Sequence, residues 1–307
     1  MAVEVESTKA RRMEKERVPW WLWPNLLSLD APLVALVWAW MFAKAWGVVS
    51  VPWQLWVTLS LAVWIVYVLD RLLDARLGDG REPRHHFHSR FSRVFLVLVV
   101  LATGWCVHSV LFVLAKTVFQ YGLVILIMAA AYFGAVWSQK RDGRPMVGKN
   151  VLAGLTFAYG TAAGIHAYSP VVGIAEMFLS AEVIIFAGLC VVNMTAIDFW
   201  NLEGEDEEDA AAVLNLGTLL LGGLAMFVYF SALKRDFFFF YEGFYHERLF
   251  YKPFAAGVLV GAACFFLLNQ ARRRIKKSAY RVLVDLAVVS PVFVFWVMTA
   301  LNQDSVR

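Results

Sequence analysis

Long apolar segments separated by short polar ones make up most of this chain. A helix that crosses the hydrocarbon core of a bilayer needs about 20 predominantly apolar residues. We predict such helices at 25–47, 51–70, 93–114, 117–138, 150–168, 177–198, 212–233, 253–271 and 280–302. The pattern therefore predicts an all-α fold, a multi-pass membrane bundle of about nine transmembrane helices around a central cavity.

Composition supports this interpretation. Of the 307 residues, 60% are hydrophobic and 17% are charged, and the mean hydropathy is +0.62. Soluble domains are nearer half apolar and a quarter charged. No linker or low-complexity tract divides the chain, so we predict a single transmembrane domain at 25–302, between an N-terminal segment at 1–24 and a tail at 303–307.

The distribution of Lys and Arg predicts the orientation. Of the 28 basic residues, 21 fall in segments that share a side with the N-terminus: 1–24, 71–93, 139–149 and 272–281, with the basic-free segment 199–211 between them. Because cytoplasmic loops carry the excess of Lys and Arg, we expect a cytoplasmic N-terminus and an external C-terminus in the cell membrane.

Carboxylates collect at the cytoplasmic ends of the second and sixth predicted spans. Asp70 and Asp74 are four residues apart and share a helix face, with Asp79 further on. Asp198, Asn201 and Glu205 repeat this spacing on the sixth span. Like charges that meet at one end of a bundle repel each other unless a cation lies between them, and Mg²⁺ is the natural candidate because it prefers oxygen ligands.

Basic residues stand beside these carboxylates. Lys140, Arg141 and Lys149 precede Asn150, which opens the fifth span, and Arg71 and Arg76 follow the second span. A helix N-terminus preceded by basic residues is typical of an anion site. Ionisable residues within membrane spans tend to face a cavity or a partner, and aromatic side chains would line the walls of such a cavity. We expect Asp285, Tyr67 and Tyr159 to line the central cavity of the bundle.

Taken together, these features resemble the UbiA superfamily of intramembrane prenyltransferases. The nine-span layout is similar, and so is the Gly-rich fifth span that begins at Lys149-Asn150. The second motif, Asp198-Phe-Trp-Asn201-Leu-Glu203-Gly204-Glu205, resembles the family's Asp-x-x-Asp-x-Glu-Gly-Asp. The first motif departs from Asn-Asp-x-x-Asp-x-x-x-Asp, since Asp70 stands at the Asn position, Arg71 at the first Asp and Gly78 at the last.

What the resemblance implies is a Mg²⁺-dependent prenyltransferase that moves the prenyl group of an isoprenoid diphosphate to a lipophilic acceptor. Its catalytic residues would be Asp70, Asp74 and Asp198, and its metal ligands Asp70, Asp74, Asp79, Asp198, Asn201 and Glu205. The diphosphate would be bound by Arg71, Arg76, Lys140, Arg141, Lys149 and Asn150. The expected partners are the two substrates and the bilayer, with no nucleic acid and no obligatory protein partner.

Two alternatives stay open. The first is a terpene cyclase of the same superfamily, which would rearrange the prenyl diphosphate without an acceptor and is favoured by the altered first motif. The second is a protein on this fold that binds or transports lipids without catalysis, favoured by Arg71 in a metal-ligand position, where a fixed cation would replace one Mg²⁺.

Overall fold

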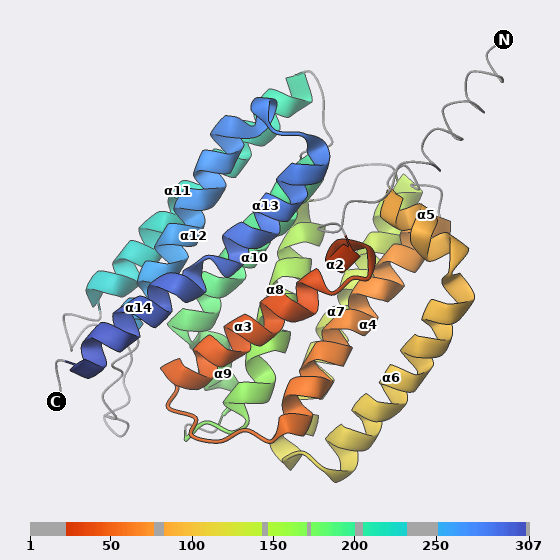
Figure 1. The fold of residues 1–307 in the computed structure, drawn as a ribbon, viewed down its shortest axis with the longest axis horizontal. Coiled ribbons are helices and arrows are strands. Elements are labelled where there is room, and N and C mark those ends of the chain that lie inside the picture. Colours follow the sequence, from red (N-terminus) through yellow and green to blue (C-terminus); the bar gives the residue numbers. More distant parts are fainter. Residues whose placement is uncertain are drawn as a thin grey trace.

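A computed structural model of the chain describes residues 23–76, 83–142, 147–170, 173–199, 205–231 and 251–304. These residues form helices and contain no strand. The α-helices are α2 (Trp23–Leu26), α3 (Asp30–Ala45), α4 (Trp53–Arg76), α5 (Pro83–Arg90), α6 (Ser92–Phe112), α7 (Lys116–Asp142), α8 (Val147–His166), α9 (Ile174–Leu179), α10 (Ala181–Phe199), α11 (Glu205–Ser231), α12 (Tyr251–Ala271), α13 (Lys277–Val289) and α14 (Pro291–Asp304), with a 3₁₀ turn, η2, at Arg272–Arg274. Figure 1 shows the long helices running side by side along one common direction.

Within this described part, seven segments are long and apolar enough to cross a membrane, as expected of a multi-pass membrane protein. They are Trp53–Ala75, Ser92–Phe112, Lys116–Ser138, Ala181–Phe199, Glu207–Ser231, Lys252–Arg274 and Ala279–Leu301. Each overlaps one of the nine predicted spans. The last combines α13 and α14, which are separated at Pro291, where the missing proline N–H and the rigid ring interrupt the helix.

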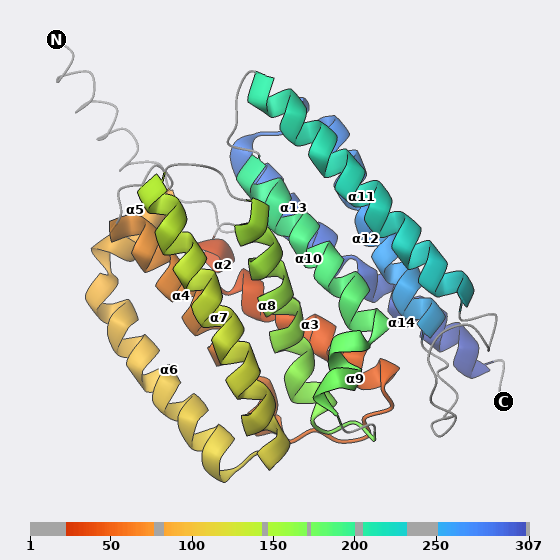
Figure 2. The ribbon, with the colours of Figure 1, turned by 180° about the vertical axis from the view of Figure 1, so that it is seen from behind.

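The other two predicted spans, 25–47 and 150–168, correspond to α3 and α8. Helix α3 has 16 residues and α8 has 20, and neither is among the seven. Both pack against several other helices: α3 packs against α4, α8 and α13, and α8 packs between α7 and α10. In Figure 2, α3 lies behind α8 and α10. A helix that buries much of its surface against neighbouring helices presents less of it to lipid, and so needs a continuous apolar surface less.

The core is an aromatic cluster centred on α3. Trp38 stacks on Phe186 of α10 with ring centroids 4.0 Å apart, and contacts Phe254 of α12 edge-on at 5.4 Å. Its indole Nε1 donates a 2.9 Å hydrogen bond to the Val288 carbonyl oxygen in α13. Because the indole N–H needs a partner when it is buried, this bond fixes α3 against the C-terminal helices.

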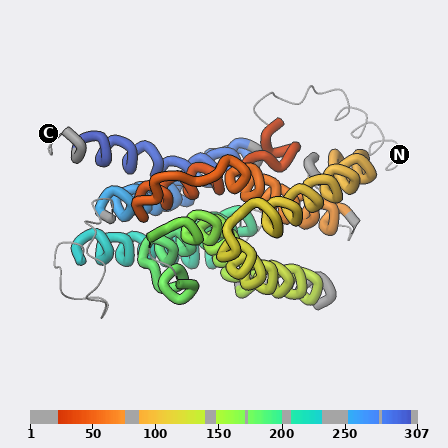
Figure 3. Tube along the Cα trace, turned by 90° about the horizontal axis from the view of Figure 1, so that it is seen from below, coloured from red at the N-terminus to blue at the C-terminus, as the bar shows by residue number. Residues whose placement is uncertain are grey.

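Apolar side chains also cover the outside of the molecule. Val100 and Leu101 of α6 are 70% and 65% exposed, and Leu219 and Leu220 of α11 are 63% and 65% exposed. Figure 3 shows the arrangement from another side, with α3, α4 and α14 on one side of the bundle and α7 and α11 on the other. Apolar surface on this scale is unfavourable in water and suits contact with lipid tails.

Candidate functional site

Helices α8 and α10 pack backbone against backbone because Gly154 of α8 has no side chain. A Cβ atom at this position would lie 2.7 Å from the backbone nitrogen of Val191 in α10, well inside van der Waals contact. Near the end of the same pair of helices, the Lys149 ammonium Nζ lies 3.3 Å from the Asp198 carboxylate Oδ2. The order of these two contacts along the chain shows that the helices are antiparallel.

Lys149 and Asp198 form an ion pair that solvent reaches. The Lys149 side chain is 23% exposed and that of Asp198 is 42% exposed. The pair therefore stands at the polar end of the bundle, where the N-terminus of α8 meets the C-terminus of α10, and not in its apolar middle.

Asp70 approaches the same lysine from α4. Its Oδ1 atom accepts a 2.9 Å hydrogen bond from the Tyr132 hydroxyl of α7. The Asp70 carboxylate lies within electrostatic reach of Asp74, one helix turn further on, and of Lys149. We call Asp70, Asp74, Tyr132, Lys149 and Asp198 the carboxylate cluster. Four helices that are far apart in sequence contribute to it.

Of the three predicted catalytic residues, Asp198 pairs with Lys149, and Asp70 lies within electrostatic reach of both Lys149 and Asp74. Other predicted metal ligands cannot be compared with them: Asp79 and Asn201 lie outside the described residues, as does the side chain of Glu205. Among the side chains that are described, no three His, Cys, Asp or Glu residues form a group that could hold a metal ion.

On the α4 side, the carboxylates of the cluster are the type of oxygen ligand that Mg²⁺ prefers. Asp70 and Asp74 are carboxylates one turn apart, and Mg²⁺ is usually bound by one or two carboxylates together with water and substrate phosphates. The Tyr132 hydroxyl donates to one oxygen of Asp70. On the α10 side, Asp198 pairs with Lys149.

Arg71, a predicted diphosphate ligand, faces the N-terminal turn and not the cluster. Its Nη1 donates a 2.6 Å hydrogen bond to the Asn25 carbonyl oxygen, and its Nη2 lies 3.7 Å from Asp30 Oδ2. Only 4% of the side chain is exposed. Asn25 Nδ2 donates to the same Asp30 oxygen at 2.7 Å. Arg71 therefore fastens α4 to the segment that precedes α3.

The remaining predicted diphosphate ligands lie close to the same end of the bundle. Asn150 follows Lys149 in the first turn of α8 and is buried, with 4% exposure. The side chains of Arg76, Lys140 and Arg141, at the ends of α4 and α7, lie outside the described part of the chain.

Tyr67 and Asp285, two of the three predicted cavity residues, are close enough to interact electrostatically. The hydroxyl of Tyr67 in α4 lies within electrostatic reach of Asp285 in α13, and of Asp30 and Cys190. Its ring contacts Phe157 of α8 edge-on, with centroids 6.3 Å apart.

Tyr159, the third predicted cavity residue, is engaged elsewhere. Its hydroxyl donates a 3.0 Å hydrogen bond to the Phe178 carbonyl oxygen of α9, and the two rings lie 4.4 Å apart. This contact holds α9 against α8 and is separate from the contacts of Tyr67.

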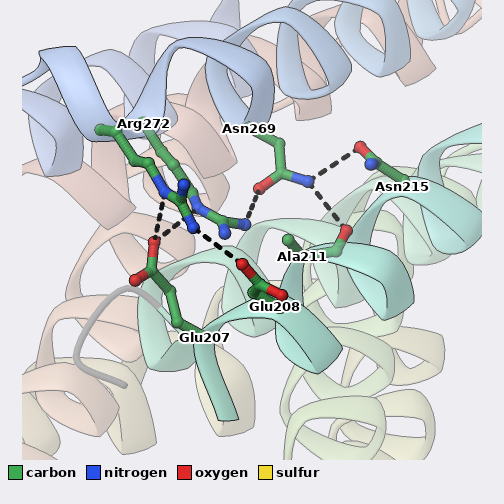
Figure 4. Close-up of polar contacts among 7 residues, drawn as sticks. Glu207, Glu208, Ala211, Asn215, Asn269 and Arg272 are labelled. Carbon is green, nitrogen blue, oxygen red and sulfur yellow. Dashed lines mark hydrogen bonds and ion pairs between the residues drawn. The ribbon is translucent and has the colours of Figure 1, made fainter. Parts of the chain in front are cut away.

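The acidic segment that follows Asp198 is partly neutralised by basic residues of the turn after α12. Arg272 and Arg273 contact Glu207 at 3.1 and 3.4 Å, and Arg273 also contacts Glu208 at 3.2 Å. Figure 4 shows this group beside Asn269 of α12, whose amide donates to the Ala211 carbonyl oxygen and to Asn215 Oδ1, at 2.9 and 2.8 Å. These contacts join α11 to α12. The sequence does not reveal these contacts, because the acidic and basic residues are about 65 positions apart and pair only once α11 packs on α12.

His88, in the histidine-rich segment after the first motif, is also structural. It is fully buried, stacks on Phe95 with centroids 4.3 Å apart, and has its Nε2 atom 3.4 Å from the Ser28 hydroxyl. His88 therefore helps to pack α5 against α6 and against the segment that precedes α3.

In comparisons with known proteins, no family model, no curated protein and no solved structure matches the chain.

Proposed function

We propose that the chain is a Mg²⁺-dependent intramembrane prenyltransferase of the UbiA type, which transfers the prenyl group of an isoprenoid diphosphate to a lipophilic acceptor. The single observation that carries this proposal is the 3.3 Å ion pair between Lys149 and Asp198 of α10, since Lys149 also lies within electrostatic reach of Asp70 on α4. The two acidic motifs on which the resemblance rests thereby share one end of the bundle.

The chemistry of prenyl transfer suits this arrangement. As the bond between the prenyl carbon and the diphosphate breaks, negative charge develops on the leaving diphosphate, and positive charges held in place stabilise it. Bound to Asp70 and Asp74, Mg²⁺ would supply part of this charge. Lys149 and the N-terminal turn of α8 supply the rest, since backbone N–H groups at a helix N-terminus attract anions.

Apolar and aromatic side chains next to the cluster suit the prenyl chain. Tyr67 and Phe157 are in contact, and Phe157 reaches Phe186 at 6.2 Å, in the core that contains Trp38. An allylic cation formed there is shielded from water and attracted by the faces of the rings.

Two buried oxygens near these rings suit an acceptor that carries a polar group. Thr156 Oγ1 in α8 and Asn193 Oδ1 in α10 have no hydrogen-bond partner among the described residues. Asn193 is three residues after Cys190, which lies near Tyr67, so it shares that helix face. Because unpaired buried oxygens cost free energy, a hydroxyl or amino group of the acceptor would offset that cost.

The membrane layout that we propose extends the seven apolar segments to nine spans around a central cavity. The internal helices α3 and α8 would be the additional two, which puts the N-terminus and the carboxylate cluster on the cytoplasmic side of the cell membrane and the C-terminus outside. The excess of Lys and Arg in the segments on the cluster's side supports this orientation.

Purified protein in liposomes tests the proposal. The sample is incubated with isoprenoid diphosphates of increasing chain length, Mg²⁺ and a lipid extract as acceptor source, and the organic phase is analysed by mass spectrometry. We expect a prenylated lipid and release of diphosphate. Asp70→Asn and Asp198→Asn should each lower the rate about 100-fold, while Asp209→Asn, at an exposed acidic position of α11, should keep it.

Other outcomes separate the alternatives. Formation of a hydrocarbon from the diphosphate alone would show that the reaction is cyclisation and not prenyl transfer. Binding of a prenyl diphosphate with no release of diphosphate would favour a lipid-binding or transport protein. Wild-type rates in both Asp70→Asn and Asp198→Asn would contradict any catalytic role for the carboxylate cluster.

A further inference from the structure

A basic turn, residues 272–276, joins α12 to α13. Its sequence contains Arg272, Arg273, Arg274 and Lys276 and no acidic residue. The turn begins with η2, at the end of the apolar segment Lys252–Arg274, which is long enough to cross a membrane. Because the hydrocarbon core ends where such a segment ends, we expect the basic turn to lie in the headgroup layer.

The acidic residues of α11 neutralise only the first half of the basic turn. Arg272 and Arg273 both contact Glu207, at 3.1 and 3.4 Å (Figure 4). Arg274 and Lys276 are exposed, and neither has an acidic partner within the part of the chain that the structure describes. The contacts with α11 therefore hold the turn in place and leave two positive charges at its surface.

The helices on both sides of the basic turn expose apolar side chains. On α12, Val260 and Leu267 are exposed two helical turns apart on one face, and this face leads toward the basic turn. On α13, which packs on α12, Leu283 and Leu286 are exposed. Apolar surface of this kind suits acyl chains, and the positive charges at its end suit a phosphate group.

We propose that the basic turn is a binding site for an anionic phospholipid. Arg274 and Lys276 bind the phosphate of the headgroup, and the acyl chains lie along the exposed faces of α12 and α13. A guanidinium group can donate to two phosphate oxygens at once. A zwitterionic headgroup carries a cation of its own beside the phosphate, and it is therefore bound more weakly. This inference goes beyond the proposed function and does not depend on prenyl transfer.

Native mass spectrometry of the full-length protein in a non-ionic detergent tests the inference. The protein is titrated with phosphatidylglycerol, or with phosphatidylcholine that has the same acyl chains, and the bound lipids are counted at each concentration. We expect the first phosphatidylglycerol to bind more tightly than any phosphatidylcholine. Arg274→Gln/Lys276→Gln should weaken its binding about 30-fold, because each basic residue near an anionic lipid contributes a factor of about five.

Lys44→Gln/Lys116→Gln is the matched control, because it removes the same charge from exposed positions of α3 and α7. This variant should bind phosphatidylglycerol as the wild type does. Inorganic phosphate, added in excess, should not displace the lipid, because it makes no contact with the apolar faces of α12 and α13.

Three results would each overturn the inference. Equal affinity of the wild-type protein for the two lipids would show that the headgroup charge is not recognised. Equal losses in the two double variants would show that binding follows the total charge of the protein and not the basic turn. Displacement of the lipid by inorganic phosphate would show that the turn binds free phosphate. The two comparisons on the wild-type protein are decisive should a variant not fold.

Discussion

The contact of Gly154 with α10 makes an alanine substitution at this glycine unusually informative. In most helix interiors, Gly→Ala stabilises the folded state by about 1 kcal/mol, because glycine is a poor helix former. Gly154→Ala would instead place a methyl group 2.7 Å from the Val191 backbone nitrogen and side-chain Cγ2. Since the nearest atoms include backbone, no rotation of a side chain relieves the clash.

The size of the effect follows from that distance. Restoring an ordinary van der Waals contact requires α8 and α10 to separate by about 0.7 Å, and overpacking of a close contact costs about 1–3 kcal/mol. The separation also lengthens the Lys149–Asp198 ion pair, now 3.3 Å long, at the end of the same helix pair. We expect Gly154→Ala to lower the free energy of unfolding despite its better helix propensity.

Gly104→Ala in α6 and Gly222→Ala in α11 are the matched controls, because a Cβ atom at either position has no neighbour within 4 Å. Reversible unfolding by sodium dodecyl sulfate, followed by circular dichroism, gives the three free energies. Gly154→Ala should be less stable than the controls by about 1–3 kcal/mol. Equal stability of the three variants would refute the close approach of α8 and α10.

Two further variants examine buried polar contacts in the same unfolding titration. Arg71→Met removes the cation beside Asp30 at the start of α3 and should lower the free energy of unfolding by about 3 kcal/mol, as breaking a buried ion pair does. Arg273→Met, in an exposed pair, should leave the unfolding midpoint unchanged. Equal losses of stability in the two variants would contradict the burial of Arg71. Tyr132→Phe deletes the hydroxyl that bonds to Asp70 and should cost about 1.5–3 kcal/mol. Tyr229→Phe, at a half-buried position of α11, is its control. A Tyr132→Phe protein as stable as that control would show that the bond contributes nothing.

The helical class and most spans of this fold are predictable from the sequence, because lipid-facing helices must be apolar along their whole length. Helices α3 and α8 are less bound by this criterion, because each buries much of its surface against other helices. The sequence indicates their apolar stretches but not the neighbours against which they pack. The break at Pro291 between α13 and α14 was also missed, although a proline within an apolar run is a recognisable signal.

The sequence indicates which residues belong to the candidate site, but it does not show which of their side chains pair with each other. The spacing of Asp70 and Asp74, and the same direction of the spans that carry Asp70 and Asp198, indicate one common end. The sequence does not reveal that Lys149 pairs with Asp198, because this depends on how α8 and α10 pack. Arg71 illustrates a limit of the same kind: neighbours on a helix point about 100° apart, so Asp70 and Arg71 face different partners.

The bond between Trp38 and Val288 has a consequence for the biogenesis of the protein, since it joins positions 250 residues apart in sequence. During synthesis, α3 reaches the translocon long before Phe186, Phe254 or α13 has been translated. Until those helices are made, Trp38 and the aromatic side chains beside it contact lipid or other transient partners, because their final partners in the folded protein have not yet been synthesised. Although α3 also packs on α4 and α8, which are translated earlier, its docking is complete only after α13 emerges, and a nascent chain released before α13 would lack the Trp38–Val288 bond.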